Sequence, residues 1–183
     1  MASAFGHALA AFALGKAFTA RQVWYFWVLG LVCAVLPDAD VIAFKFGIPY
    51  ESMWGHRGFT HSFAFAAMLA VVVVLLFFRH EKPFRMRWWG LWAYFFLATS
   101  SHAILDAMTT GGLGVAFFSP WDNSRYFFPW RPIQVSPIGV GNFFSEWGLR
   151  VIKSEAIWIG IPCLAFMVLG IAVRLVRKKK RTT

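Results

Sequence analysis

Charged side chains are scarce in this sequence. Of its 183 residues, 8 are Asp or Glu and 18 are Lys or Arg, and together they make up 14% of the chain, whereas about 25% is usual for a soluble domain. Hydrophobic residues make up 59%, and the mean hydropathy is +0.60. These values exclude an ordinary soluble domain and a disordered chain. We expect one integral membrane domain.

Cysteine is also rare, and both copies, Cys33 and Cys163, lie within apolar runs. Two such residues form neither a disulfide framework nor a zinc-ligand spacing, so we expect small buried hydrophobic side chains. The first 18 residues are apolar but lack the basic start of a cleavable signal peptide. We therefore expect this segment to be retained as a helix.

Five apolar segments predict an all-α, polytopic membrane helix bundle. They are Ser3–Phe18, Gln22–Leu36, Thr60–Phe78, Trp88–Met108 and Glu155–Val176. Several are shorter than the roughly 20 residues that cross the hydrocarbon of a bilayer. We therefore expect the outer surface of the protein to be recessed toward the centre of the membrane. The predicted organisation is one transmembrane domain over 1–176, with outer loops at about 37–59 and 109–154, and a basic cytoplasmic tail at 177–183.

The basic residues predict an orientation. Most lie at one end of the predicted bundle: Lys16, Arg21, Arg79, Lys82, Arg85, Arg87, Arg174, Arg177, Lys178, Lys179, Lys180 and Arg181. The positive-inside rule puts this end in the cytoplasm, with the N-terminus outside and the C-terminus inside. The net charge of +10 is then an orientation signal. The terminal basic run is expected to contact anionic lipid, and no nucleic-acid partner is expected.

Seven of the 13 acidic and histidine residues gather in four short motifs. They are Gly6-His7, PDAD at 37–40, GHRGFTHS at 55–62 and SHAILD at 101–106. At about 1.5 Å per helical residue, the last three motifs reach roughly 23–29 Å from the nearest cytoplasmic basic residue, and His7 reaches roughly 14 Å. Segments far apart in sequence therefore converge near the outer face.

The residue types in these motifs are those of a metal site. His102 and Asp106 are four residues apart and share one helix face, while Asp38 and Asp40 can present two carboxylates from a Pro-broken turn. His56 and His61 flank a glycine-containing turn. Imidazole and carboxylate ligands suit zinc or another divalent first-row metal. The set suits two ions with a bridging water, or one ion with supporting carboxylates.

Each motif alone has a plain structural explanation. His7 can be a packed, hydrogen-bonded residue, the His102–Asp106 pair can be an intrahelical contact, and the two aspartates can stop a helix. Taken together they favour a metal, because uncompensated carboxylates at membrane depth are costly. His80 is excluded, since it lies in the basic cytoplasmic loop beside Arg79 and Glu81.

The motifs GHALA, PDAD, GHRGFTHS and SHAILDAMTT, followed by RYFFPWRPI, resemble the YdjM family of bacterial membrane-bound predicted metal-dependent hydrolases. That family is distantly similar to zinc-dependent phospholipases C and single-strand nucleases, which bind a zinc cluster through His and Asp. The resemblance implies one set of ligands in this chain: His7, Asp38, His56, His61, His102 and Asp106. It also implies hydrolysis at the bacterial inner membrane. We find no counterpart of the terminal amine ligand of the soluble enzymes.

The expected reaction is hydrolysis of a phosphoester in a membrane lipid or other amphiphile. Asp38 or Asp40 would orient a water molecule or take its proton. Arg57 would meet an anionic group, as would Arg125 and Arg131, although the last two can equally be interfacial or salt-bridged. The aromatic outer segment 109–154 suits a lipid interface.

Three other functions remain open. The first is a metal-stabilised structural or regulatory membrane protein without catalysis. The second is a transporter, which would need a continuous polar path that the inner halves of the third and fifth predicted helices do not offer. The third is a membrane-anchored nucleic-acid factor, which would depend on the basic tail at 177–183 and not on the His/Asp set. The metal, the substrate and the oligomeric state stay open at this point.

Overall fold

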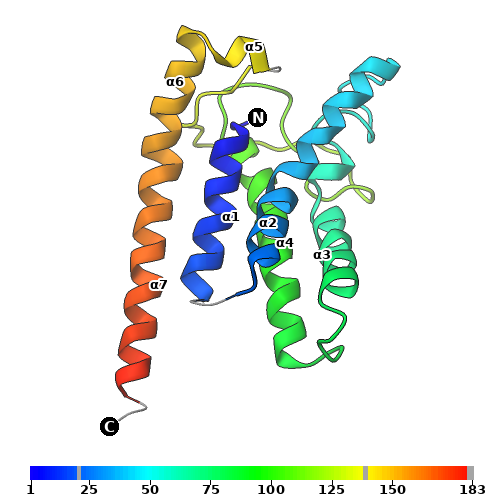
Figure 1. Ribbon diagram of the computed structural model, residues 1–183. Helices are drawn as coiled ribbons and strands as arrows, with labels where there is room; N and C mark the ends of the chain where they lie inside the picture. The colour runs from blue at the N-terminus through cyan, green and yellow to red at the C-terminus, as the bar shows by residue number, and fades with distance from the viewer. Residues whose placement is uncertain (20–21, 138–139, 181–183) are drawn as a thin grey trace.

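The computed structural model describes residues 1–19, 22–137 and 140–180 and shows a helical bundle (Figure 1). Its α-helices are α1 (Ala4–Phe18), α2 (Trp24–Val35), α3 (Phe63–Phe77), α4 (Met86–Ala107), α5 (Val140–Phe143), α6 (Glu146–Glu155) and α7 (Ile161–Lys179). Two 3-10 helices, η1 (Leu36–Phe46) and η2 (Phe59–His61), and one π-helix, η3 (Ala156–Gly160), complete the set. The described residues contain no β-strand beyond isolated bridges, which confirms the all-α prediction.

Two continuous helices are long and apolar enough to cross a membrane. They run over Trp24–Phe46 and Glu146–Arg177, and shorter apolar helices cover Ala4–Phe18 and Phe63–Phe77. Serine hydroxyls cap three of the helices: Ser3 accepts from the amide of Gly6, Ser62 from the amide of Phe65, and Ser145 from the amide of Gly148. Such caps satisfy amide groups that a helix start leaves without a partner.

Helix α4 lies at the centre of the bundle and packs against α1, α2 and α3, while α7 packs against α1 (Figure 1). Aromatic side chains fill the core between α2 and α4, where the rings of Phe26 and Tyr94 stack at 4.2 Å. Small residues allow α1 and α7 to approach, since a Cβ on Gly170 would lie 2.6 Å from the Cα of Ala17. Close backbone approach at small residues is the usual way in which membrane helices associate.

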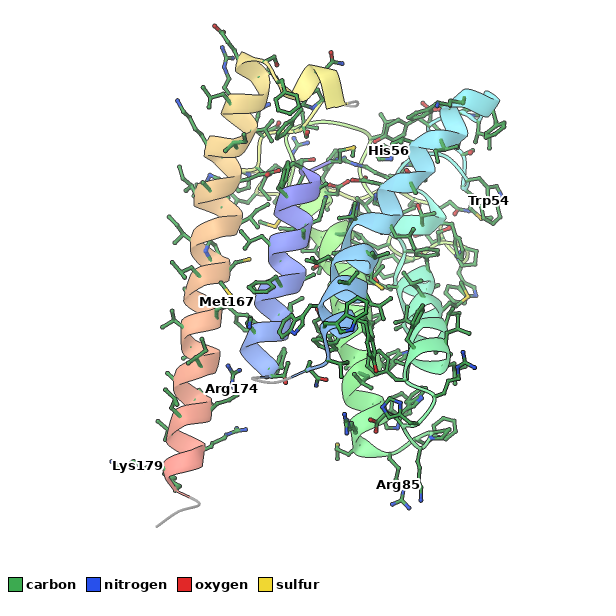
Figure 2. The ribbon with its side chains drawn as sticks, viewed as in Figure 1. Trp54, His56, Arg85, Met167, Arg174 and Lys179 are labelled. Atoms are coloured by element: carbon green, nitrogen blue, oxygen red, sulfur yellow. The ribbon has the colours of Figure 1, made fainter. Side chains whose placement is uncertain are left out.

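The two ends of the bundle differ in charge. The N-terminus lies near η1 and α5 at one end, and the C-terminus lies at the opposite end (Figure 1). Arg85 and Lys179 lie toward the C-terminal end, whereas His56 and Trp54 lie at the other (Figure 2). These basic residues therefore lie at the end to which the sequence assigned them, and Arg21 and Arg181 of the same predicted set are outside the described residues. The side of the membrane that each end faces stays a prediction.

Both predicted outer loops contain helix. The α-helical part of α2 ends at Val35, close to the predicted stop, but the chain continues through Pro37 as η1. Proline is tolerated there because it lies in the first turn of a new helix, where its missing N–H is not needed. The C-terminal helix begins at Glu146 and not at Glu155, because Ser145 caps it earlier. Cys33 is buried as expected, and Cys163 is half-buried.

Candidate metal centre

The structure brings four of the predicted ligands to one buried point. Asp38 comes from η1, His61 from η2, and His102 and Asp106 from α4, and one ligand atom of each lies within 4.8 Å of all the others. A second group, formed by Asp40, His56 and His61, meets the same criterion. His61 belongs to both groups, so the two motifs after α2 and before α3 converge on α4.

The two central histidines point the same ring nitrogen toward each other. His102 Nδ1 lies 2.7 Å from the carbonyl oxygen of Ala34, and His61 Nδ1 lies 3.1 Å from the hydroxyl oxygen of Thr60 and 3.2 Å from Asp40 Oδ2. Each acceptor holds a proton on Nδ1 and leaves a lone pair on Nε2. The two Nε2 atoms are 3.0 Å apart. Facing lone pairs repel, so a proton or a metal ion belongs between them.

Several polar atoms around this point lack hydrogen bonds. Within the described residues, neither oxygen of Asp38 and neither ring nitrogen of His7 has a hydrogen-bond partner, although both side chains are buried. His7 stacks on His102 with ring centroids 3.7 Å apart, and its Nε2 is 3.4 Å from Asp106 Oδ1. Unsatisfied buried groups are costly. This donor set therefore fits a cation, which would ligate the atoms that the protein leaves unpaired.

Asp40 differs from Asp38 because its oxygens are occupied. Oδ1 lies 2.6 Å from His56 Nδ1, and Oδ2 accepts from the Arg57 amide at 3.1 Å and the Thr60 hydroxyl at 2.7 Å. A 3-10 helix turns about 120° per residue, so side chains two positions apart leave it in different directions. The two carboxylates expected at one point consequently lie on two sides of His61.

Arg57 is fully buried and faces protein atoms. Its Nε donates to Asp106 Oδ2 at 3.0 Å, and its two Nη atoms donate to the carbonyl of Gly111 at 2.9 Å and the hydroxyl of Thr109 at 3.0 Å. Its φ of 62° lies in the left-handed region, which non-glycine residues adopt at a cost. The side chain balances the charge of Asp106 and ties the turn before η2 to the end of α4.

The other two predicted phosphate ligands lie apart from the cluster. Arg125 donates to the backbone carbonyls of His56 at 2.9 Å and Tyr50 at 2.7 Å, and burial lowers its pKa from the ordinary arginine value. Arg125 thereby connects the segment that follows η1 with the outer segment 109–154. Arg131 is exposed and lies over the ring of Phe127, with its guanidinium carbon 4.6 Å from the ring centroid.

Sequence reasoning missed Glu155 and Ser3. Glu155 is buried, and its two oxygens accept from the amide and the hydroxyl of Ser3, each at 2.5 Å. The neighbouring amide of Ala2 donates to Asp106 Oδ1 at 2.7 Å. Glu155 lies in the long apolar C-terminal helix. An acidic residue is unusual in such a segment, and this was the signal in the sequence that could have identified Glu155. His80 is 62% exposed and lies 3.3 Å from Glu81, as a solvated residue should.

Comparison with known proteins agrees with the motifs. The family described as YdjM inner membrane protein matches residues 1–180. The chain is 41% identical over 138 residues to the inner membrane protein YbcI of Escherichia coli (strain K12), which covers 75% of this chain and 78% of YbcI. No solved structure matches the chain. A match over nearly the whole chain shows that this protein belongs to the YdjM family of inner membrane proteins.

Proposed function

We propose that this inner membrane protein is a metal-dependent hydrolase that cleaves a phosphoester of a membrane lipid or other amphiphile at the outer leaflet. One observation carries the proposal: buried nitrogen and carboxylate atoms of Asp38, His61, His102 and Asp106 face a common point. Ionisable groups at membrane depth are costly and usually functional. Histidine and carboxylate ligands also occur in catalytic zinc centres.

The first group of residues is the better metal site. Tetrahedral zinc with ligands at about 2.0–2.1 Å separates two ligand atoms by roughly 3.3 Å, close to the 3.0 Å between the Nε2 atoms of His61 and His102. Asp38 and Asp106 supply oxygens, and His7 lies at the edge. In the second group both Asp40 oxygens already have hydrogen-bond partners, whereas the first group contains Asp38, whose two oxygens have none among the described residues. One ion, with Asp40 behind His61, fits the contacts best.

The residues around the centre have separate tasks in this proposal. A bound divalent ion would polarise the ester and make a water molecule more acidic. Asp38 carries the unpaired carboxylate and is suited to accept the proton of that water. Asp40 orients His61 through Nδ1. Arg57 compensates Asp106 and adds positive charge beside an anionic substrate.

The proposed topology follows from the charges at the two ends of the bundle. Twelve of the 18 basic residues are predicted at one end of the bundle. This end, which holds Arg85 and Lys179 (Figure 2), would face the cytoplasm. The metal centre would then lie toward the outer leaflet. A reporter enzyme that works only in the cytoplasm should be active when it is fused to the C-terminus. Activity of a reporter that works only in the periplasm would reverse the proposed orientation.

A non-catalytic, metal-stabilised membrane protein is the second candidate. The observation in its favour is that the site is closed to solvent. Four of its residues are each 0–1% exposed: His7, His61, His102 and Asp106. Structural metal sites are closed, whereas catalytic sites keep an open position. The two candidates therefore share the metal and differ in whether any substrate is turned over.

The test begins with metal analysis of protein purified in mild detergent, followed by a panel of phospholipids with and without chelator. We expect about one ion per chain and chelator-sensitive release of a phosphorylated or dephosphorylated product. His102→Ala should lose both metal and activity. His80→Ala, at an exposed histidine, is the matched control and should keep both. Stoichiometric metal without turnover of any lipid would favour the second candidate, and an absence of metal would refute both.

A further inference from the structure

A side cavity of about 520 Å³ opens between α1 and the junction of α2 with η1. Apolar residues form most of its wall: Ala4, Val32, Val35, Leu36 and Ala39. Asp38 and Met1 complete the wall, and Asp38 supplies its carboxylate. Mostly apolar walls with a few polar groups, in a volume of about 300–1,000 Å³, are typical of small-molecule sites.

The outer part of this groove belongs to the lipid-facing surface. Val32 is 50% exposed on α2, and α2 with η1 forms one of the two helices long and apolar enough to cross a membrane. In a bilayer, an apolar groove on such a helix is surrounded by hydrocarbon and not by water. The molecules that can reach it from the side are the acyl chains of lipids.

The inner end of the groove leads to the metal centre. The Asp38 side chain is only 8% exposed, and its Oδ1 lies 3.3 Å from His102 Nε2. Neither Asp38 oxygen has a hydrogen-bond partner among the described residues. Asp38 is therefore the member of the cluster that lines the apolar groove, whereas His102 and Asp106 are 0% exposed. An amphiphile in the groove would therefore bring its polar part next to Asp38.

We propose that this groove binds one acyl chain of a phospholipid, which enters sideways from the bilayer and presents its phosphate at the Asp38 end. The inference rests on the proposed hydrolase function for the fate of that lipid, but binding in the groove does not require turnover. It makes the substrate a membrane phospholipid, since a water-soluble phosphoester has no tail to occupy the groove.

The test uses the full chain in phosphatidylglycerol vesicles that contain a diazirine-labelled acyl chain. After photolysis, peptides that contain Ala4 and Val32–Ala39 should carry the label above the level found on the exposed face of α7. Val32→Trp, which fills the groove, should lower this labelling by about tenfold, because overfilling a formed cavity is strongly unfavourable. Val28→Trp is the matched control, one turn earlier on α2 and 47% exposed, and should leave labelling unchanged.

Metal content and hydrolysis separate the two proposals. Both tryptophan variants should keep the metal, and Val32→Trp should lose hydrolysis of phosphatidylglycerol, whereas Val28→Trp should keep it. Groove labelling in a protein that hydrolyses nothing would support the lipid site and refute the hydrolase. Hydrolysis in a protein whose groove is labelled no more than α7, or equally in Val32→Trp and wild type, would refute the lipid site alone.

Discussion

His61 is the residue on which the two groups of ligands depend. Its Nε2 faces His102, and its Nδ1 faces Asp40, which lies between His61 and His56. Asp40 thereby selects the tautomer that leaves Nε2 free to bind a cation. Carboxylates behind metal-binding histidines have this role in many metal sites. Asp40, which would not touch the metal, is then as informative as the acids that would.

Replacing this acid should weaken metal binding without removing a ligand. Asp40→Asn keeps the shape of the side chain, but its amide can donate a hydrogen bond to His61 Nδ1. This favours the tautomer with the proton on Nε2, which cannot bind a cation through that atom. We expect metal affinity to fall by about 10–100-fold, the usual effect of such a partner, in a titration against a competing chelator. Asp122→Asn, at an exposed carboxylate that bonds to Ser124 and Tyr126, is the control. Unchanged affinity in Asp40→Asn would contradict the proposed role.

At the scale of elements, the sequence predicted helices and motifs well. The apolar runs and the spacing of His102 and Asp106 are local features, and the structure has all five expected helices. What could not be read was the direction of side chains on η1, because nothing in PDAD distinguishes a 3-10 turn from an irregular one. The contact of Glu155 with Ser3 spans 152 positions, and a tertiary contact at that separation leaves no periodic signal.

Glu155 connects the C-terminal helix to the metal centre through α1. Its carboxylate accepts from the amide and the hydroxyl of Ser3. The neighbouring amide of Ala2 donates to Asp106. We expect Glu155→Ala to leave the buried amide of Ser3 without its acceptor and to cost about 1–3 kcal/mol of stability, together with part of the metal affinity. Glu155→Gln keeps an acceptor for the amide and should restore most of both.

The measurements for this prediction are thermal unfolding in detergent and metal titration. Glu146→Ala removes another acid from the same helix at an exposed position and serves as the control. If Glu155→Gln is as damaging as Glu155→Ala, the charge of Glu155 matters more than its hydrogen bonds, and the proposed positioning role is wrong.

Helix α2 approaches α4 closely at a glycine. A Cβ on Gly30 would lie 2.0 Å from the hydroxyl oxygen of Tyr94, whereas a Cβ on Gly90 of α4 would meet nothing within 4 Å. Gly30→Ala should therefore cost about 1–3 kcal/mol through overpacking. Gly90→Ala should be neutral or stabilising by up to about 1 kcal/mol, since alanine favours helix. Equal unfolding temperatures for the two variants would show that α2 and α4 do not pack as described.

At the scale of the whole molecule, the chain concentrates its scarce charge in one place. Asp38, Asp106 and Arg57 are buried in the helical bundle together with four histidines, His7, His56, His61 and His102. One arginine balances one of the two carboxylates, so the bundle without metal retains a buried negative group and facing imidazole nitrogens. Such a centre destabilises the empty protein and stabilises the loaded one. Metal binding should therefore be visible in the stability of the entire bundle.

Removal of the metal should lower the unfolding temperature of the helices. An ion present at about a thousand times its dissociation constant stabilises the folded state by roughly 4 kcal/mol. We expect circular dichroism to show earlier unfolding with chelator, and recovery when zinc is restored. His61→Ala lacks the ligand shared by both groups and should unfold at the same temperature with and without chelator. A wild-type bundle that is indifferent to chelator would mean that protons, and not a metal ion, hold the two facing histidines together.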